Sequence, residues 1–128
     1  MIEVKEMETN NLDSRINEYS YDMINDNKDK KDVINLIDKA LGVLSNDGVY
    51  GYYVYCKSKK NNDISKAFIE DIIEKFKNDI DIDYKNSCDE FFIELSEDLN
   101  SLLFFKDIIE RILIYARYHA KALGDNNG

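Results

Sequence analysis

The sequence of 128 residues contains no proline or tryptophan, and only five glycines, two cysteines and one histidine. So little proline and glycine favours long helices with short connections over a turn-rich β fold. Two cysteines, Cys56 and Cys88, are too few for a disulfide framework and indicate a reducing compartment. No apolar run reaches about 18 residues and the first residues are charged. We therefore expect no membrane span and no signal peptide, and a cytoplasmic protein.

The small number of histidine and cysteine residues also leaves few candidates for catalytic residues. The one histidine, His119, lies in the apolar arc of a predicted helix, where packing is a commoner role than base or ligand. Cys56 has Lys57 beside it but no base partner. The chain has too few histidines and cysteines for a metal site, and it has neither a phosphate-binding glycine loop nor paired Glu-x-x-His motifs. We predict no catalytic residue, no metal and no cofactor, and a protein that acts by binding.

Charge is distributed unevenly along the chain, which carries a net charge of −9. Residues 63–98 hold twelve acidic residues and four lysines. Residues 48–60 hold three lysines and no acid, and residues 99–124 hold four basic and two acidic residues. The overall charge argues against binding of free nucleic acid, because phosphate repels an anionic surface. The two basic segments are the candidates for local phosphate contacts, although scattered surface lysines also serve solubility.

Apolar spacing predicts an all-α fold, a compact bundle of five to six helices with the last one longest. We expect a single domain over residues 1–128, with 125–128 as a disordered tail. The expected helices cover residues 3–24, 29 or 32 to about 44, 48–60, 63–80, a fifth helix from the capping box at 87–90 to a break near 96–100, and 99–123. Residues 25–31 and 79–86 are expected to be connections. Local signals support these ends: turn residues at 45–48, an N-cap at Asp63, and a capping box from Ser87 to Glu90.

The last predicted helix, 99–123, has an apolar arc covering about half of its circumference. The centre of the arc comprises Leu102, Phe105, Ile109, Ile112, Leu113, Ala116, Ala120 and Leu123. Its margins comprise Phe104, Ile108, Tyr115, His119 and Ala122. The opposite side carries a mostly basic row of Lys106, Glu110, Arg117 and Lys121, and Gly124 is expected to end the helix as its C′ residue. The pattern predicts a core helix with one basic outer edge that excludes His119.

Tyrosines are concentrated in residues 48–60, which also end in three lysines. Such tyrosines can serve as stacking platforms for nucleic-acid bases. Half-buried core aromatics are the commoner role, and we favour that interpretation here.

Two segments resemble the small helical subunit of type III-B CRISPR (Cmr) effector complexes. The first segment is GVYGYYVYCKSK at 48–59, taken together with the preceding Asp47. Its start, Asp47-Gly48-Val49, is similar to the family's N-G-L, and its end, Lys57-Ser58-Lys59, is similar to the family's K-S-K pattern. LIYARYHAKAL at 113–123 is similar to the closing pattern L-x-W-L-K-R-[FY]-A-E-A-L, with Tyr115 in the tryptophan place and Arg117 in the first basic place. Tyr118 and Lys121 depart from that pattern. The small subunit of type III-A (Csm) complexes has a comparable last helix and is the alternative.

The resemblance implies an all-α, non-catalytic subunit that stacks along the effector filament in antiviral defence. Its implied partners are the backbone subunits, the large polymerase-like subunit, further copies of itself, and crRNA and target RNA, which it contacts at phosphates. The implied RNA-facing residues are Lys57, Lys59 and Arg117. Lys60, Lys106 and Lys121 are added on charge and position alone.

A different class of function stays open on charge grounds. A small acidic helical immunity or inhibitor protein would use the acidic residues of 63–98 to cover a basic site on a toxin or nuclease.

Overall fold

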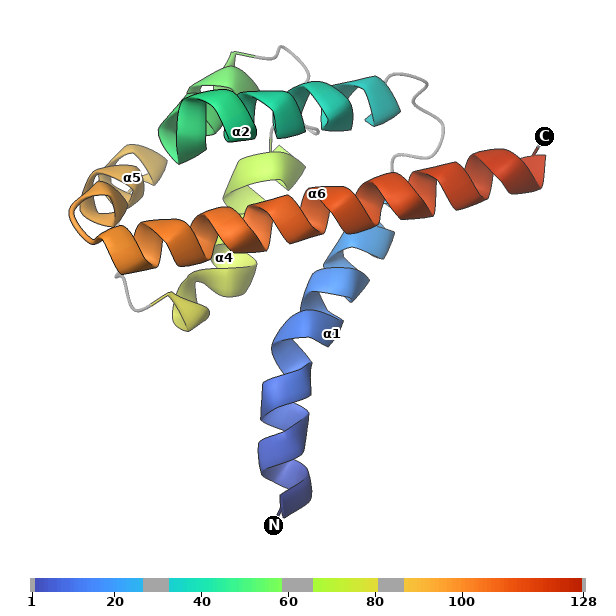
Figure 1. The fold of residues 1–128 in the computed structure, drawn as a ribbon, viewed down its shortest axis with the longest axis horizontal. Coiled ribbons are helices and arrows are strands. Elements are labelled where there is room, and N and C mark those ends of the chain that lie inside the picture. The colour runs from blue at the N-terminus through green and yellow to red at the C-terminus, as the bar shows by residue number, and fades with distance from the viewer. Residues whose placement is uncertain (1, 27–32, 59–65, 81–86, 128) are drawn as a thin grey trace. The chain divides into compact units, whose positions relative to one another are not determined.

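The computed structural model describes residues 2–26, 33–58, 66–80 and 87–127, and over these residues the protein is all-α and has no strand (Figure 1). The elements in chain order are α1 (Ile2–Asp26), α2 (Val33–Lys57), the π-helix η1 (Lys66–Glu70), α4 (Asp71–Phe76), the 3₁₀-helix η2 (Lys77–Asp79), α5 (Cys88–Ser96) and α6 (Leu99–Asn127). The predicted fold class is confirmed, and the last helix, with 29 residues, is the longest.

The described residues fall into two compact units. Unit 1 comprises the described residues of 1–38 and 110–128, and unit 2 those of 39–109. Helices α2 and α6 each contribute residues to both units. That the whole chain forms one domain stays a prediction.

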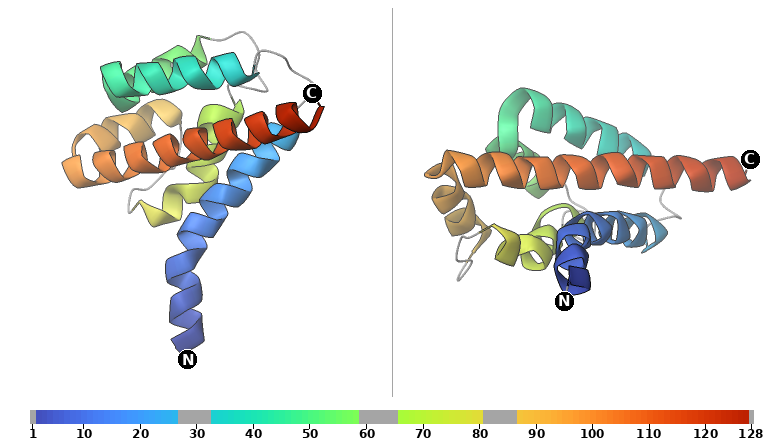
Figure 2. Two further views of the ribbon diagram at one scale, coloured as in Figure 1. Left: turned by 45° about the vertical axis from the view of Figure 1, so that its right-hand side comes forward. Right: turned by 60° about the horizontal axis from the view of Figure 1, so that its bottom comes forward.

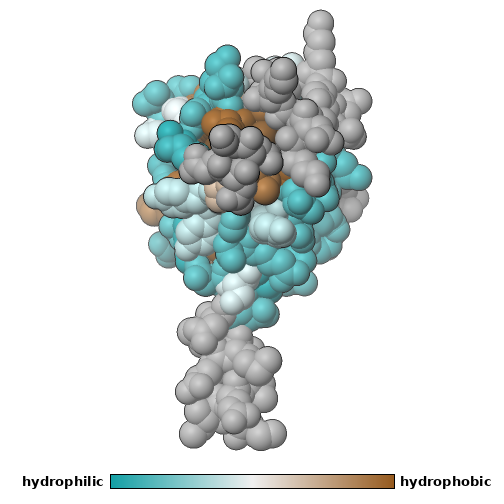
Figure 3. All heavy atoms as spheres, turned by 90° about the vertical axis from the view of Figure 1, so that its right-hand side faces the viewer, coloured by the Kyte–Doolittle hydropathy of each residue, from teal (hydrophilic) through white to brown (hydrophobic). Residues whose placement is uncertain are grey.

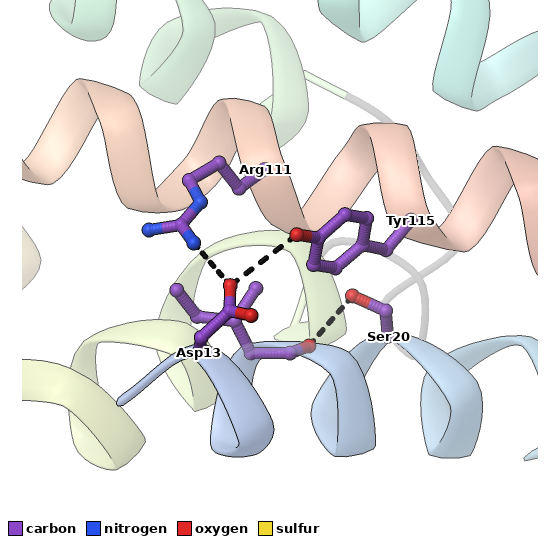
Figure 4. A network of polar contacts seen from close by, with 5 residues as sticks. Asp13, Ser20, Arg111 and Tyr115 are labelled. Atoms are coloured by element: carbon purple, nitrogen blue, oxygen red, sulfur yellow. Dashed lines mark hydrogen bonds and ion pairs between the residues drawn. The ribbon is translucent and has the colours of Figure 1, made fainter. Parts of the chain in front are cut away.

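In unit 1, apolar side chains of α1 pack with the second half of α6. The fully or almost fully buried residues are Ile16, Met23, Ile24, Val33, Ile37, Ile112, Leu113, Ala116 and Ala120. Ser20 is buried among them, and its Oγ lies 2.8 Å from the carbonyl oxygen of Ile16 and 2.9 Å from that of Ile112. Because a hydroxyl has one proton, Ser20 donates to one of these carbonyls at a time. The contact with the Ile112 carbonyl shows that α6 lies close to α1 at this small side chain, and Figure 4 shows its bond within α1.

In unit 2, aromatic rings fill much of the core. Phe91 and Phe92 of α5 and Phe105 of α6 meet edge to face, with ring centroids 5.3 to 5.9 Å apart. Tyr52 of α2 is fully buried, and its hydroxyl donates to the carbonyl oxygen of Phe68 at 2.9 Å. That bond satisfies a polar group which would be costly to bury without a partner.

Helix α2 is interrupted at Gly48, where the sequence predicts one helix to end and another to begin. Gly48 has φ 81° and ψ −172°, a conformation nearly restricted to glycine. In Figure 2 the ribbon of α2 changes direction within its green part. The kink also brings Asp47 against Gly51, where a Cβ would lie only 2.6 Å from the Asp47 Cβ. The predicted helix 48–60 is thus present up to Lys57, and residues 59 and 60 lie outside the described residues.

The predicted helix 63–80 is present from residue 66, but its winding changes twice. Phe68, Ile72, Phe76 and Ile80 are all buried, although a strict four-residue repeat drifts by about 40° per step on a regular α-helix. The chain begins as a π-helix, continues as α4 and ends as the 3₁₀-helix η2. A wider turn at the start reduces that drift and keeps the apolar side chains together. The predicted N-cap, Asp63, lies outside the described residues.

The ends of the last two helices, α5 and α6, show which local sequence signals mark where a helix begins or ends. The Ser87 side chain caps α5 by accepting from the backbone N–H of Glu90 at 3.2 Å, as the capping motif predicts. Asp98 caps α6 by accepting from the Asn100 N–H at 3.2 Å and the Ser101 hydroxyl at 2.8 Å. The prediction that Gly124 ends α6 is wrong, because the helix continues to Asn127. A glycine within a helix costs only about 1 kcal/mol relative to alanine and does not by itself stop one.

Within the described residues, none of the helices combines the length and apolar character needed to cross a membrane. Most of the predicted connections 25–31 and 79–86 lies outside the described part of the chain.

Candidate nucleic-acid interface

Lys57, the first predicted RNA-facing residue, lies at the C-terminal end of α2 beside an acid. Its Nζ is 3.6 Å from Oδ1 of Asp89 and 5.2 Å from the centroid of the Tyr53 ring. The Tyr53 hydroxyl donates to the same Asp89 oxygen at 2.5 Å. The Lys57 side chain is nevertheless 61 % exposed. It therefore presents a cation to solvent whose charge is partly balanced by Asp89.

The three groups of this cluster shift one another's pKa values. The hydrogen bond from Tyr53 lowers the pKa of Asp89, and the charge of Lys57 lowers it further. Burial raises the pKa of Tyr53, and the hydrogen bond to Asp89 adds to that shift. The hydroxyl of Tyr53 and the charge of Asp89 raise the pKa of Lys57. At neutral pH the cluster thus holds an ammonium, a carboxylate and a protonated phenol.

Removing the Tyr53 hydroxyl tests this arrangement. In Tyr53→Phe we expect the pKa of Asp89 to rise towards its usual value, because its principal hydrogen-bond donor is gone. The native pKa is depressed, so the stability contributed by Asp89 is present above its unfolded-state pKa. That contribution is lost as the pH falls through the native pKa. The carboxyl pKa is measured by an NMR titration, with Tyr50→Phe as the matched control. An unchanged Asp89 pKa in Tyr53→Phe contradicts the assignment.

Arg117, the second predicted contact, lies in unit 1 and also pairs with an acid. Its Nε is 2.8 Å from Oδ1 of Asp38 in α2, and the two side chains are 42 % and 44 % exposed. A guanidinium has five N–H donors, so an ion pair at Nε leaves it able to bind a phosphate as well. The bridge also links the start of α2 to α6, which gives Arg117 a structural role inside unit 1.

Other polar side chains of α6 hold α1 in the same unit. Arg111 forms an ion pair with Asp13, and the Tyr115 hydroxyl lies 3.3 Å from the same Asp13 oxygen (Figure 4). His119 Nε2 is 3.0 Å from the amide oxygen of Asn17. The ring of His119 also meets that of Tyr21 edge to face, with centroids 5.4 Å apart. His119 is therefore a partnered packing residue against α1 and lies outside the basic edge.

The other four predicted RNA contacts are Lys59, Lys60, Lys106 and Lys121. Lys106 is partly exposed and Lys121 is exposed, both on α6. Lys59 and Lys60 lie outside the described residues. Lys57 and Lys106 belong to unit 2, whereas Arg117 and Lys121 belong to unit 1. Of these predicted contacts, Lys57 lies beside Asp89 within unit 2 and Arg117 beside Asp38 within unit 1.

Acidic side chains account for much of the exposed surface of α4 and α5. Glu74 of α4 and Glu90, Glu94 and Glu97 in or next to α5 are exposed, as is Glu70 at the end of η1. Figure 3 draws the right-hand side of Figure 1 and not the surface of α5, and the residues coloured there are mostly hydrophilic, with a smaller apolar area among them. Among the described residues, no three histidine, cysteine or acidic side chains gather as metal ligands.

Sequence reasoning missed the acids that accompany the two cations. Asp38 and Asp89 lie far along the chain from Arg117 and Lys57, so no helical spacing pairs them. Asp89 carries a local signal only for the first turn of α5, where acids suit the helix dipole.

Comparison with protein-family models, curated proteins and solved structures finds no match for this chain. Its function is therefore inferred from its own residues and their geometry.

Proposed function

We propose that the protein is a non-catalytic small subunit of a type III CRISPR interference complex that supports crRNA and target RNA through phosphate contacts. The observation that carries the proposal is the resemblance of residues 48–59 and 113–123 to that family's small subunits. The all-α fold is compatible with it. Lys57 and Arg117, one from each matched segment, present cationic side chains, the first exposed and the second partly exposed. Type III-B is favoured over type III-A by the first segment.

The local charges suggest how such a subunit would hold RNA. Asp89 and Asp38 balance Lys57 and Arg117, so free RNA gains little from this acidic chain alone. In an assembled complex, neighbouring subunits supply further positive charge and fix the RNA backbone close to these cations. Phosphate then competes with Asp89 for Lys57, whereas at Arg117 it uses guanidinium N–H groups other than Nε–H, which faces Asp38. Contacts of this kind add affinity and position without reading sequence, which the guide supplies by pairing.

Charge reversal tests the phosphate contacts. In a complex carrying Lys57→Glu, Lys59→Glu and Arg117→Glu, we expect weaker retention of target RNA. The slope of log affinity against log salt is negative, and its magnitude should also fall by about 0.9 for each duplex phosphate that the variant no longer neutralises. Filter binding at several salt concentrations measures both quantities. Asp38→Asn and Asp89→Asn together should act in the opposite direction, because they remove the acids that balance Lys57 and Arg117.

A matched control separates these contacts from the change in net charge. Lys39, Lys66 and Lys75 are exposed and lie outside the two matched segments. Changing all three to glutamate alters the net charge by the same amount. We expect retention and salt slope close to those of the unchanged complex. If the two triple variants behave alike, the proposed contacts at Lys57, Lys59 and Arg117 are wrong.

A second candidate is an acidic inhibitor of a toxin or nuclease, and the exposed acids of α4 and α5 favour it. An anionic face of this kind accelerates association with a basic partner through electrostatic steering. The cations of the two matched segments have no special part in this mechanism.

Affinity purification of the native protein separates the two candidates. Co-purifying proteins are identified by mass spectrometry, and co-purifying RNA is sequenced. Several subunits together with repeat-derived guide RNA support the CRISPR subunit. A single basic protein partner without RNA supports the inhibitor and contradicts the first proposal.

A further inference from the structure

An exposed stripe on the second part of α2 combines an aromatic, an aliphatic and a cationic side chain. Tyr50 is 62 % exposed, Val54 is 49 % exposed and the Lys57 side chain is 61 % exposed. Spacings of four and three residues place them on one side of the helix, within about 10 Å along its axis. Their grouping beside a cation on one side of the helix makes this stripe a candidate surface for a ligand.

Tyr50 is supported from beneath by other rings. Its ring centroid lies 6.1 Å from that of Tyr53, which is buried. Tyr53 in turn stacks on Phe92, with centroids 4.4 Å apart and planes 24° from parallel. The row of rings thus connects an exposed tyrosine to the core of unit 2. A platform already supported in this way loses little conformational freedom when a ligand stacks on it.

The cation that forms part of the stripe favours an anionic ligand over an apolar one. Residues 48–60 contain three lysines and no acid, and Lys57 stands on the same side of α2 as Tyr50. Asp89 balances part of that charge but leaves the ammonium exposed. An aromatic ring paired with a nearby cation is the combination that binds single-stranded nucleic acid, where a base stacks and a phosphate is neutralised.

We propose that Tyr50 stacks on an unpaired RNA base while Lys57 contacts a neighbouring phosphate. This inference rests on the proposed function and names the nucleotides that this face would take, those outside the guide–target duplex. It assigns to the tyrosine-rich segment a binding role in addition to the packing done by Tyr52 and Tyr53. Recognition is independent of sequence, because every base has a π face.

The test compares Tyr50→Ala and Tyr50→Phe in the purified complex, with a target RNA that carries unpaired flanking nucleotides. Loss of one stacked base should weaken binding of this RNA about 5- to 150-fold in Tyr50→Ala. Tyr50→Phe keeps the ring and should bind as the unchanged complex does. The salt slope should stay the same in both variants, since Lys57 still neutralises its phosphate. Trimming the unpaired nucleotides should abolish the difference between them.

Two controls keep the comparison specific. Tyr21→Ala removes another exposed tyrosine, 49 %, from α1 outside both matched segments and should leave binding unchanged. Thermal unfolding of the free Tyr50→Ala chain should match that of the unchanged chain, because the side chain is mostly exposed.

The outcomes separate this inference from the function on which it rests. If Tyr50→Ala binds normally while the reversal of Lys57, Lys59 and Arg117 weakens binding, stacking is wrong and the proposed function stands. If Tyr50→Phe loses as much affinity as Tyr50→Ala, the ring is not the binding element and the inference is overturned. If affinity purification of the native protein recovers no RNA, both proposals fail.

Discussion

Replacing Gly48 with alanine is expected to lower the free energy of unfolding by about 1–3 kcal/mol. Gly48 has φ 81° and ψ −172°, and a side chain at these angles is strained whatever its surroundings. Apart from Gly48 itself, its two chain neighbours and the adjacent helix backbone, no heavy atom lies within 4 Å of the position that the alanine Cβ would take, so the cost comes from the backbone conformation and not from a collision. Urea unfolding measures the loss as a lower midpoint with an unchanged slope.

Gly42 provides the matched control for this variant. It lies in the same helix and unit with regular helical geometry, and its Cβ position is also open. Gly42→Ala is expected to raise the free energy of unfolding by about 0.5–1 kcal/mol, since alanine reduces the entropy of the unfolded chain and favours the helix. The two substitutions are chemically identical but opposite in expected sign. A similar loss in both variants would contradict a glycine-specific kink at position 48.

The kink connects the fold to the proposed binding face. The matched segment 48–59 begins at Gly48, and the part of α2 that follows carries the stripe of Tyr50, Val54 and Lys57. A regular helix through position 48 would give this part of α2 a different direction. Gly48→Ala is therefore also expected to weaken RNA binding in any complex where the stripe contributes to it.

Helical periodicity predicts the buried face of α6 well. The centre of the predicted apolar arc includes Phe105, Ile109 and Ile112, which are fully buried, and excludes Leu103, which is 53 % exposed. Periodicity succeeds here because a regular α-helix fixes the direction of every side chain. The prediction fails at Ala122, which lies at the margin of the predicted apolar arc but is exposed. It is also silent on the π and 3₁₀ turns of η1 and η2, which depend on packing between elements.

The site is less predictable than the fold. Sequence alone identifies Lys57 and Arg117 as cations of helical surfaces, and the first is exposed and the second partly exposed. It does not identify Asp89 and Asp38 as their counter-ions, because those pairs form only when distant segments fold together. The exposure of Tyr50 among buried tyrosines likewise follows from the direction of α2 after the kink. These features depend on how segments pack in three dimensions, which residue spacing within one helix does not predict.

Replacing Phe105 with alanine is expected to cost about 3–5 kcal/mol, more than any other substitution proposed for this chain. Phe105 is fully buried, and its ring meets those of Phe91 and Phe92 at centroid distances of 5.3 and 5.9 Å. Alanine removes the ring and leaves a cavity between α5 and α6 that the stiff neighbouring rings cannot fill.

Leu103→Ala isolates the contribution of burial, because it also shortens an apolar side chain of α6 within unit 2. Leu103 is 53 % exposed, so we expect a change within about 0.5 kcal/mol. A loss of about 3–5 kcal/mol approaches the whole stability of a small domain, so Phe105→Leu provides a milder variant that still folds. Urea unfolding should show the smallest loss of unfolding free energy in Leu103→Ala, a larger loss in Phe105→Leu and the largest in Phe105→Ala. A Phe105→Ala variant as stable as Leu103→Ala would mean that the aromatic cluster does not hold α5 against α6. The row of rings beneath Tyr50, which includes Phe92, would then lose its support in the core.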